Sequence, residues 1–380
     1  MYEPVRFDLA SMALLWPAIA AGSISDMAAL AARQFAALAV GESPPAVAEP
    51  QWVSAHTIAL ELKTVRLRDF SDDAECQPVL LCAPLALHSA VIADFERGHS
   101  LVAALRQAGL RRLLVTDWRS ASREMRHLGT DNYLADLNVM VDEIGAPVDL
   151  IGLCQGGWMA LMYAARFPKK VRKLVLVGAP IDIRAAPSAL SSLADSTPME
   201  VFRELVRFGD GLVPGRKLLK FWGPDSIPSE DIHAVLQTKT EADTAALARL
   251  EARFRDWYAW AIDLPGRFFL DVVENLYKRN ELAEGRFAVL GREIDLATVR
   301  APVFMLAARD DELVAPPQLF ALERLVGTPA HNLRKVTAPC RHLGLFMGER
   351  ILKDIWPEIA RWIREPDDTA VGPRVMAPAL

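Results

Sequence analysis

The sequence predicts an α/β fold, with a mostly parallel sheet, helices on both of its faces and a helical insertion. Short continuous apolar runs alternate with helical segments through most of the chain, which is typical of βαβ units. A glycine-rich turn at residues 152–157 joins one apolar run directly to a helix. The chain has 380 residues, of which 52% are hydrophobic, so it can bury one large core that carries an insertion.

Residues 1–50 are predicted to form an Ala-rich helical arm that ends in a Pro-rich break. Residues 9–25 are uncharged, but they follow charged residues rather than a basic leader and contain Pro17 and Gly22. This segment therefore fits neither a signal peptide nor a membrane span. The arm either packs on the core or binds a partner, a membrane or a hydrophobic particle. We favour packing on the core, as for most helices of globular proteins.

The first part of the core is expected over residues 51–183. Apolar and polar residues alternate over much of 57–67, which predicts a half-exposed edge strand. Later apolar runs are short and continuous, as in buried parallel strands, and helical spacing separates them. The elements are expected, in order, at 78–84 (strand), 99–108 (helix), 112–117 (strand), 131–144 (helix), 148–152 (strand), 155–167 (helix) and 174–179 (strand).

The alternation of strands and helices stops from residue 184 to 290, where the pattern is helical and rich in aromatic residues. We expect this insertion to be both a cap over the site and a helical satellite with its own core. The tail at 365–380 contains three prolines and is predicted to be disordered. The core should resume over 291–364, with strands at 302–309 and 333–337 and a final helix at 349–364.

Composition excludes several classes of function. The net charge is −5 and the Arg-rich segment 111–126 is expected to be a solvated face, so no nucleic-acid footprint is present. No P-loop, dinucleotide-binding glycine motif or paired histidines occur, and we expect neither a metal nor a separate cofactor. The four cysteines are far apart, which excludes a disulfide framework and favours a reducing cytoplasm. They are Cys76, Cys82, Cys154 and Cys340.

The hexapeptide Gly152-Leu153-Cys154-Gln155-Gly156-Gly157 has the pattern of a nucleophile elbow. Glycines are needed there because side chains in so tight a turn would collide with the strand or the helix. Cys154 would stand at the helix N-terminus, where the positive end of the macrodipole favours a thiolate. The alternative is a cysteine buried as a small hydrophobe. Strand, glycine spacing and helix together favour the nucleophile.

A nucleophile at such an elbow needs a carboxylate and a histidine, which follow it in that order in the α/β-hydrolase fold. Asp310 and Asp311 come just after the strand expected at 302–309, and either can be the acid. His342 follows the last strand and is predicted to be the general base rather than a surface histidine. His342 would accept the thiol proton, the carboxylate would orient the imidazole, and the thiolate would attack a carbonyl.

The oxyanion of that reaction needs backbone donors. The N–H of Gln155 is one, and a second is expected from the loop after the first buried strand, near Leu85 and Ala86. His88 lies in the same loop; such a histidine is more often a satisfied loop residue than a participant, and it stays an alternative. The other histidines lie in no motif: His56, His99, His127, His233 and His331.

The elbow and the segment MYAARFPKKV at residues 162–171 resemble those of polyhydroxyalkanoate synthases, especially the short class whose catalytic subunit works with a separate partner subunit. The resemblance extends over roughly residues 58–364 and implies Cys154, Asp311 and His342 as the catalytic triad. Its further parts are the oxyanion loop and Asp-x-x-x-x-x-Ser-Leu-Val of residues 84–102, Thr116-Asp117-Trp118, Asp131-Asn132-Tyr133, Phe269 to Asp295, and Asp311-Glu312-Leu313-Val314.

Two positions depart from the synthase pattern. Synthases usually have His where this chain has Glu312, and Gly where it has Arg341. The final segment, His342 to Arg350 with Trp356-Pro357 beyond it, is more similar to intracellular polyhydroxyalkanoate depolymerases, a related family that also uses cysteine. The resemblance thus leaves the direction of the reaction open.

Three hypotheses follow. The first is a cysteine acyltransferase that polymerises 3-hydroxyacyl-CoA, with coenzyme A as part of the substrate and a second synthase subunit or a homodimer as partner. The second is a hydrolase with the same triad, either a depolymerase or an ester or thioester hydrolase. The third is a non-catalytic protein that coats a polymer granule through the arm and the cap. All three fit a cytoplasmic protein, at the granule surface in the third.

Overall fold

The computed structural model describes residues 48–222, 228–238 and 244–366. All but the last three residues of the helical arm predicted for 1–50 lie outside the described residues. The same holds for the predicted tail beyond residue 366.

A single eight-stranded sheet forms the centre of the described structure, in the order β1-β2-β4-β3-β5-β6-β11-β12. β1 is antiparallel to β2, which is antiparallel to β4, and the six remaining strands are mutually parallel. The predicted α/β class is confirmed. The strands are β1 (Thr57–Glu61), β2 (Val65–Asp69), β3 (Val79–Cys82), β4 (Leu113–Trp118), β5 (Val148–Leu153), β6 (Val171–Val177), β11 (Val303–Ala308) and β12 (Leu333–Ala338).

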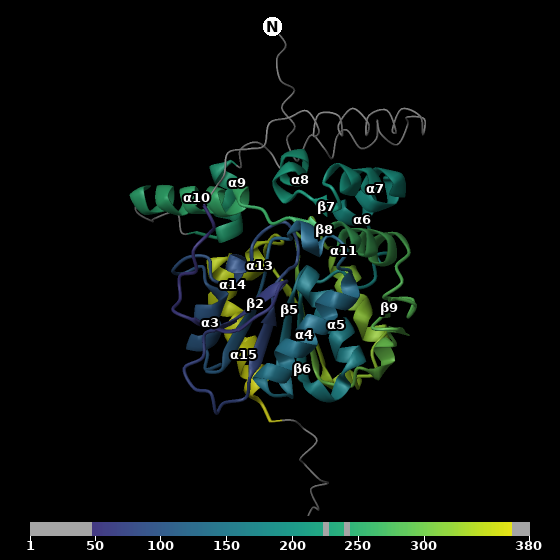
Figure 1. Ribbon diagram of the computed structural model, residues 1–380. Coiled ribbons are helices and arrows are strands. Elements are labelled where there is room, and N and C mark those ends of the chain that lie inside the picture. The colour runs from purple at the N-terminus through teal and green to yellow at the C-terminus, as the bar shows by residue number, and fades with distance from the viewer. Residues whose placement is uncertain (1–47, 223–227, 239–243, 367–380) are drawn as a thin grey trace, which may run out of the picture.

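Helices cover both faces of the sheet (Figure 1). Successive side chains of a strand point to opposite faces, so Leu150 of β5 belongs to one buried cluster and Ile151 to the other. The first cluster contains residues of α4 (Thr130–Ile144) and α5 (Gln155–Arg166), with α12 (Pro316–Phe320) near the end of the sheet. The second contains residues of α3 (Leu101–Gln107), α13 (Gly344–Met347), α14 (Glu349–Asp354) and α15 (Trp356–Arg364).

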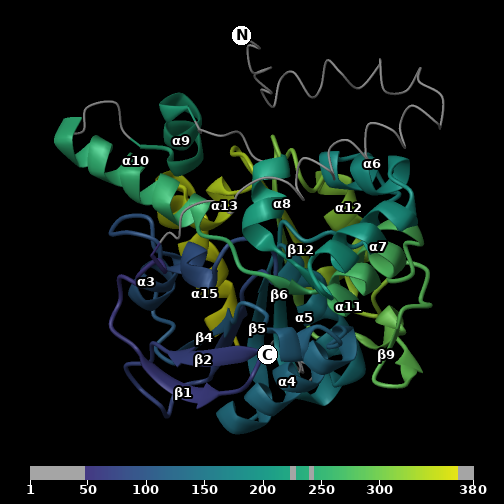
Figure 2. The same ribbon diagram turned by 45° about the horizontal axis from the view of Figure 1, so that its top comes forward.

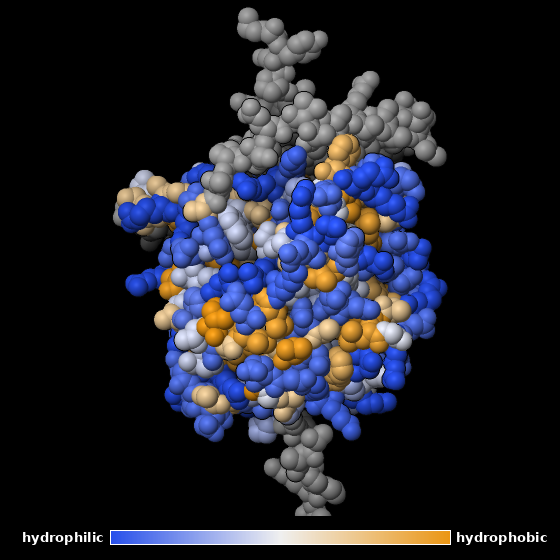
Figure 3. Space-filling view, in the orientation of Figure 1, coloured by the Kyte–Doolittle hydropathy of each residue, from blue (hydrophilic) through white to orange (hydrophobic). Residues whose placement is uncertain are grey.

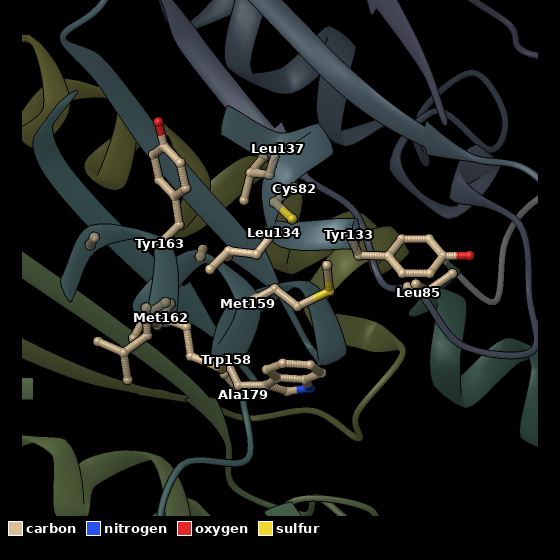
Figure 4. Packing of buried hydrophobic residues seen from close by; sticks show 14 of the residues in the cluster. Cys82, Leu85, Tyr133, Leu134, Leu137, Trp158, Met159, Met162, Tyr163 and Ala179 are labelled. Carbon is tan, nitrogen blue, oxygen red and sulfur yellow. The ribbon is translucent and has the colours of Figure 1, made fainter. Parts of the chain in front are cut away.

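Packing between α4, α5 and the sheet supports the elbow. Trp158 and Met159 of α5 belong to one buried cluster with Leu134 of α4, Cys82 at the end of β3 and Leu85 in the loop that follows (Figure 4). All five side chains are almost fully buried. Burying each large apolar side chain contributes about 1.5–3 kcal/mol, so the first turns of α5 are held firmly against the strand end.

Two predicted elements are each divided in the structure. The strand expected at 57–67 is a hairpin of β1 and β2, whose turn is closed by a hydrogen bond from the Leu62 N–H to the Val65 carbonyl (2.8 Å). The final helix expected at 349–364 breaks at Ile355 into α14 and α15. The break precedes Pro357, which has no N–H to donate and is favoured in the first turn of a new helix.

The insertion predicted at 184–290 contains mainly helices, and its division from the core stays a prediction. Figures 1 and 2 place α6 to α10 together at one end of the sheet. The helices are α6 (Ala189–Ser196), α7 (Met199–Phe208), α8 (Gly215–Trp222), α9 (Ser229–Leu236), α10 (Thr244–Ala259) and α11 (Gly266–Asp271), and the π-helical η4 (Val272–Lys278) continues α11. The short strands are β7 (Leu212–Val213), β8 (Leu264–Pro265) and β9 (Ala288–Val289). β9 pairs with β10 (Arg292–Glu293), just beyond the insertion.

The surface seen in Figure 3 is mainly hydrophilic, with separate apolar patches. Within the described residues, the large apolar side chains that are exposed are Ile58, Val139 and Phe208. None of the described helices combines the length and the apolar character needed to cross a bilayer.

Candidate active site

The turn between β5 and α5 is a nucleophile elbow with Cys154 at its apex. Cys154 has φ 47° and ψ −116°, a backbone conformation that non-glycine residues rarely adopt. Its N–H donates to the Val177 carbonyl (2.8 Å), and its own carbonyl accepts from the Gly157 N–H (2.8 Å). The neighbouring strand and the first turn of α5 thereby hold the strained residue in place.

The glycines around Cys154 are required by space. A Cβ on Gly156 would lie 2.2 Å from the Cys82 carbonyl oxygen, and one on Gly157 would lie 2.4 Å from the Ala179 Cβ. A Cβ on Gly152 would lie 2.5 Å from the Gly157 Cα. The elbow therefore packs directly against the end of β3 and against the segment after β6.

His342 and Asp311 form a buried hydrogen-bonded pair. The His342 Nδ1 lies 2.8 Å from one Asp311 carboxylate oxygen and 3.0 Å from the other. Asp311 follows β11 and accepts the Leu313 and Val314 N–H groups at 2.9 and 2.8 Å, which fixes its carboxylate. The side chains of His342 and Asp311 are only 2% and 0% exposed.

The structure brings His342 to Cys154 as well. The electrostatic influence of Cys154 on the imidazole indicates that the two side chains are close. Burial opposes a positive charge on the imidazole, but the charges of Asp311 and Cys154 outweigh it and raise the pKa of His342 well above its usual value. Gly178, with φ +54°, makes room for the ring, because a Cβ there would lie 3.0 Å from the His342 Cε1.

Asp310, the alternative acid, points elsewhere. Its side chain is 54% exposed and forms an ion pair with the Arg309 guanidinium at 3.0 Å. The hydrogen bond with Arg309 lowers the pKa of the Asp310 carboxyl. Of the two adjacent aspartates, Asp311 is therefore the one in contact with His342.

The predicted oxyanion residues lie on the two sides of the elbow. Gln155 is the first residue of α5, so its backbone N–H has no acceptor within the helix. Leu85 and Ala86 lie just after β3, and within the described ranges neither backbone N–H donates a hydrogen bond. The Trp118 indole donates to the Ala83 carbonyl (2.8 Å), which holds the start of this loop.

The structure places His88 away from the triad. Its ring lies between those of Trp257 and Tyr258 in α10, with centroids 4.8 and 4.5 Å away. Burial lowers the pKa of His88 to about 4, so the ring is neutral at physiological pH. His88 thus joins the oxyanion loop to the helical insertion through packing.

Sequence reasoning did not identify Tyr277 of η4. Its hydroxyl accepts a hydrogen bond from the Gln155 side-chain amide at 2.8 Å. Burial raises the pKa of Tyr277, and the charge of Cys154 raises it further. The nearest signal in the sequence was the resemblance over Phe269 to Asp295, which singled out no residue there.

The two departures from the synthase pattern lie beside His342. The Glu312 carboxylate accepts the His342 N–H at 3.5 Å, the outer limit of a hydrogen bond. Arg341 forms an ion pair with Asp231 of α9 at 3.0 Å. Arg341 therefore links the loop that carries His342 to the helical insertion.

No cluster of three His, Cys, Asp or Glu side chains suited to a metal ion occurs within residues 48–222, 228–238 and 244–366.

Comparisons with known proteins identify the fold and the family. A family model described as PHB de-polymerase C-terminus matches residues 230–367, which include Asp311 and His342. In fold, a solved structure from Burkholderia cenocepacia assigned as an aryl esterase aligns with a TM-score of 0.51 at 15% identity, covering 82% of this chain and 98% of that one.

Several relatives in sequence are named poly(3-hydroxyalkanoate) polymerase subunit PhaC. The one from Synechocystis is 30% identical over 298 residues, which cover 76% of this chain and 78% of that protein. The one from Allochromatium vinosum is 27% identical and covers 77% and 82%. The one from Haloferax mediterranei is 25% identical over 80% of this chain, which spans only 63% of that relative's length. The chain therefore belongs to the polyhydroxyalkanoate synthase family and is an enzyme of the α/β-hydrolase type.

Proposed function

We propose that this protein is a cysteine acyltransferase that polymerises 3-hydroxyacyl-CoA through a covalent acyl-Cys154 intermediate. The observation that carries the proposal is the Cys154 sulfur beside the buried His342–Asp311 pair, in a chain of the polyhydroxyalkanoate synthase family. The reaction needs coenzyme A only as part of the substrate.

In the first step, His342 holds the proton of Cys154 and the thiolate attacks the thioester carbonyl. The C–S bond to coenzyme A breaks, the imidazolium returns its proton to the departing thiolate, and an acyl-Cys154 thioester is left. One thioester replaces another, so the step has little free-energy change. Asp311 keeps the imidazole in the required tautomer and stabilises its charge.

In the second step, neutral His342 accepts the proton of a 3-hydroxyl group, whose oxygen attacks the acyl-Cys154 carbonyl. An ester forms, the C–S bond to Cys154 breaks, and the proton returns to the sulfur, so the chain is longer by one unit. The backbone N–H groups of Gln155 and of Leu85 or Ala86 would bind the oxyanion in both steps.

A polymerase of this kind is expected to work with a partner. We propose a second synthase subunit or a homodimer, and action at the surface of a polymer granule, because the relatives are named as polymerase subunits. The helical insertion over the site would exclude water from the acyl-enzyme, which a polymerase needs and a hydrolase does not.

A hydrolase with the same triad is the second candidate. The match of residues 230–367 to the depolymerase C-terminus favours it, as do Glu312 and Arg341 at positions where synthases usually have His and Gly. In that case His342 would activate water instead of a hydroxyl group, and the products would be free hydroxy acids.

The test is to incubate the purified protein with 3-hydroxybutyryl-CoA and to follow both free coenzyme A and the size of the acyl product. Release of coenzyme A with lengthening oligomers supports the acyltransferase, and release of free 3-hydroxybutyrate supports the hydrolase. Cys154→Ala should abolish either activity. Cys76→Ala, which removes a cysteine of intermediate exposure outside the site, should keep it.

Turnover that survives in Cys154→Ala would contradict the proposal. Inertness of Cys154 towards thiol reagents, together with binding to polymer granules, would instead support the non-catalytic granule protein.

A further inference from the structure

The side chain of Gln155 is fixed at both ends. The Trp158 indole N–H can only donate, so the atom 2.6 Å from it must be the Gln155 amide oxygen. The amide nitrogen therefore faces the other way, where it lies 2.8 Å from the Tyr277 hydroxyl oxygen. An amide nitrogen only donates, so the Tyr277 oxygen is the acceptor in this hydrogen bond.

The hydroxyl hydrogen of Tyr277 must then point away from Gln155. Among the residues that the structure describes, the Tyr277 hydroxyl donates no hydrogen bond. Burial raises the pKa of Tyr277, and the nearby charge of Cys154 raises it further, so the phenol keeps its proton at neutral pH. Tyr277 is thus a hydrogen-bond donor without an acceptor, in the electrostatic reach of the sulfur.

Gln155 is the residue next to Cys154, so its hydrogen bond to Tyr277 brings the phenol to the elbow, and among the described residues Tyr277 and Cys154 form no hydrogen bond with each other. In the proposed reaction the carbonyl carbon is bonded to the sulfur, and its oxygen lies one bond beyond. That oxygen gains negative charge as the thiolate attacks, which is where a fixed neutral donor is most effective.

We propose that Tyr277 is a further catalytic residue, whose hydroxyl donates a hydrogen bond to the substrate carbonyl oxygen as Cys154 attacks it. Gln155 then serves the oxyanion twice, through its own backbone N–H and through the side chain that orients Tyr277. The inference rests on the proposed function, since it needs acylation of Cys154.

The test compares two reactions of Cys154 in the full chain. Acylation by 4-nitrophenyl butyrate forms an oxyanion, whereas alkylation by iodoacetamide does not. Tyr277→Phe removes the hydroxyl and keeps the ring. We expect the acylation rate constant to fall by about 10²–10³, as for the loss of one oxyanion donor. The KM for the ester and the rate of alkylation should stay unchanged.

Tyr163→Phe is the matched control. It removes another phenol from the same region, on α5, whose hydroxyl contacts the Asn138 side-chain oxygen at 3.3 Å. Both reactions should keep the wild-type rate in this variant. Equal losses of acylation and alkylation in Tyr277→Phe would overturn the inference, because Tyr277 would then act by positioning Cys154 or His342.

Wild-type acylation in Tyr277→Phe would also overturn the inference and would leave the proposed function intact. Failure of the wild-type protein to form any acyl-Cys154 would overturn both.

Discussion

Gly156 shows most directly how single residues define the elbow. Ala at this position would direct its Cβ to within 2.2 Å of the Cys82 carbonyl oxygen and 2.6 Å of the Ala83 carbonyl oxygen. Both contacts are with backbone, which cannot rotate away as a side chain could. The elbow and the start of the oxyanion loop would have to move apart.

We therefore expect Gly156→Ala to lower the free energy of unfolding by about 1–3 kcal/mol, the usual range for overpacking. Acylation of Cys154 should also be lost, because the oxyanion donors lie on the two displaced segments. Chemical denaturation and the 4-nitrophenyl butyrate assay measure the two effects.

Gly98→Ala is the control for this prediction. Its Cβ would meet no atom within 4 Å, although the backbone has φ +85°. The strain of a left-handed conformation costs about 1–2 kcal/mol and should leave acylation unchanged. If Gly98→Ala abolished acylation as Gly156→Ala does, the steric explanation of the elbow would be wrong.

The buried cysteines differ in their surroundings. Burial raises the pKa of Cys82 and of Cys340 to about 12 in each case, so both thiols are protonated at physiological pH. Cys340 lies only two residues before His342, and the carboxylates of Asp311, Asp310 and Glu312 raise its pKa further. Of the buried cysteines described, Cys154 is the one whose charge helps to raise the pKa of His342.

At the scale of elements, α9 is attached to the loop that carries His342. Ile232, Val235 and Leu236 of α9 share a buried cluster with α13. Gln237, in the left-handed conformation at the end of α9, accepts the Ile351 N–H at 3.3 Å. Arg341 adds its ion pair with Asp231 at the rim.

Most of this attachment should come from the apolar packing. The Arg341 and Asp231 side chains are 51% and 42% exposed, and ion pairs of such exposure contribute about 0–1 kcal/mol. We expect Arg341→Gly to change the free energy of unfolding by no more than about 1 kcal/mol after allowance for glycine flexibility. Urea denaturation of Arg341→Gly, Asp231→Asn and the double variant isolates the pair. A coupling of several kcal/mol would contradict this view.

At the scale of the whole molecule, His88 links the oxyanion loop to the helical insertion and makes this link sensitive to acid. Its pKa is lowered by burial from 6.5 to about 4. In the unfolded chain the ring binds a proton below about pH 6.5, while in the folded protein it does not until about pH 4. The contribution of neutral His88 to stability is therefore present above pH 6.5 and is lost as the pH falls.

The free energy of unfolding of the wild type should fall, relative to His88→Phe, by up to about 3 kcal/mol between pH 6.5 and 4. The comparison cancels every other titrating group that the two proteins share. Urea denaturation at a series of pH values measures it. Parallel pH profiles for the two proteins would show that His88 is not shielded from water.

The direction of the reaction also depends on the whole molecule rather than on the site residues alone. The arrangement of Cys154, His342 and Asp311 suits either proposed reaction, acyl transfer or hydrolysis. The chain is similar to proteins named polymerase subunits over most of its length and to a depolymerase C-terminus over residues 230–367. The two proposed reactions differ in the access of water to acyl-Cys154, which we expect to depend on how far the insertion covers the site.

The sequence by itself determined the α/β class, the family, and most strands and helices of the core, except that the strand predicted at 57–67 is a hairpin and the helix predicted at 349–364 is divided. It did so because strand burial, helical spacing and the steric needs of the elbow are local properties that single segments express. It also named Cys154, Asp311 and His342, which the structure brings together. Their catalytic roles stay predictions.

Only the tertiary structure decided the matters that depend on contacts between distant segments. Asp311 rather than Asp310 meets His342, because the turn after β11 directs one carboxylate inward and the other to Arg309. His88 packs on α10 instead of joining the triad. Tyr277 comes to Gln155 from 122 residues away. No local pattern encodes such meetings, because they arise only when segments far apart in the chain, loops of the core and helices of the insertion, pack together.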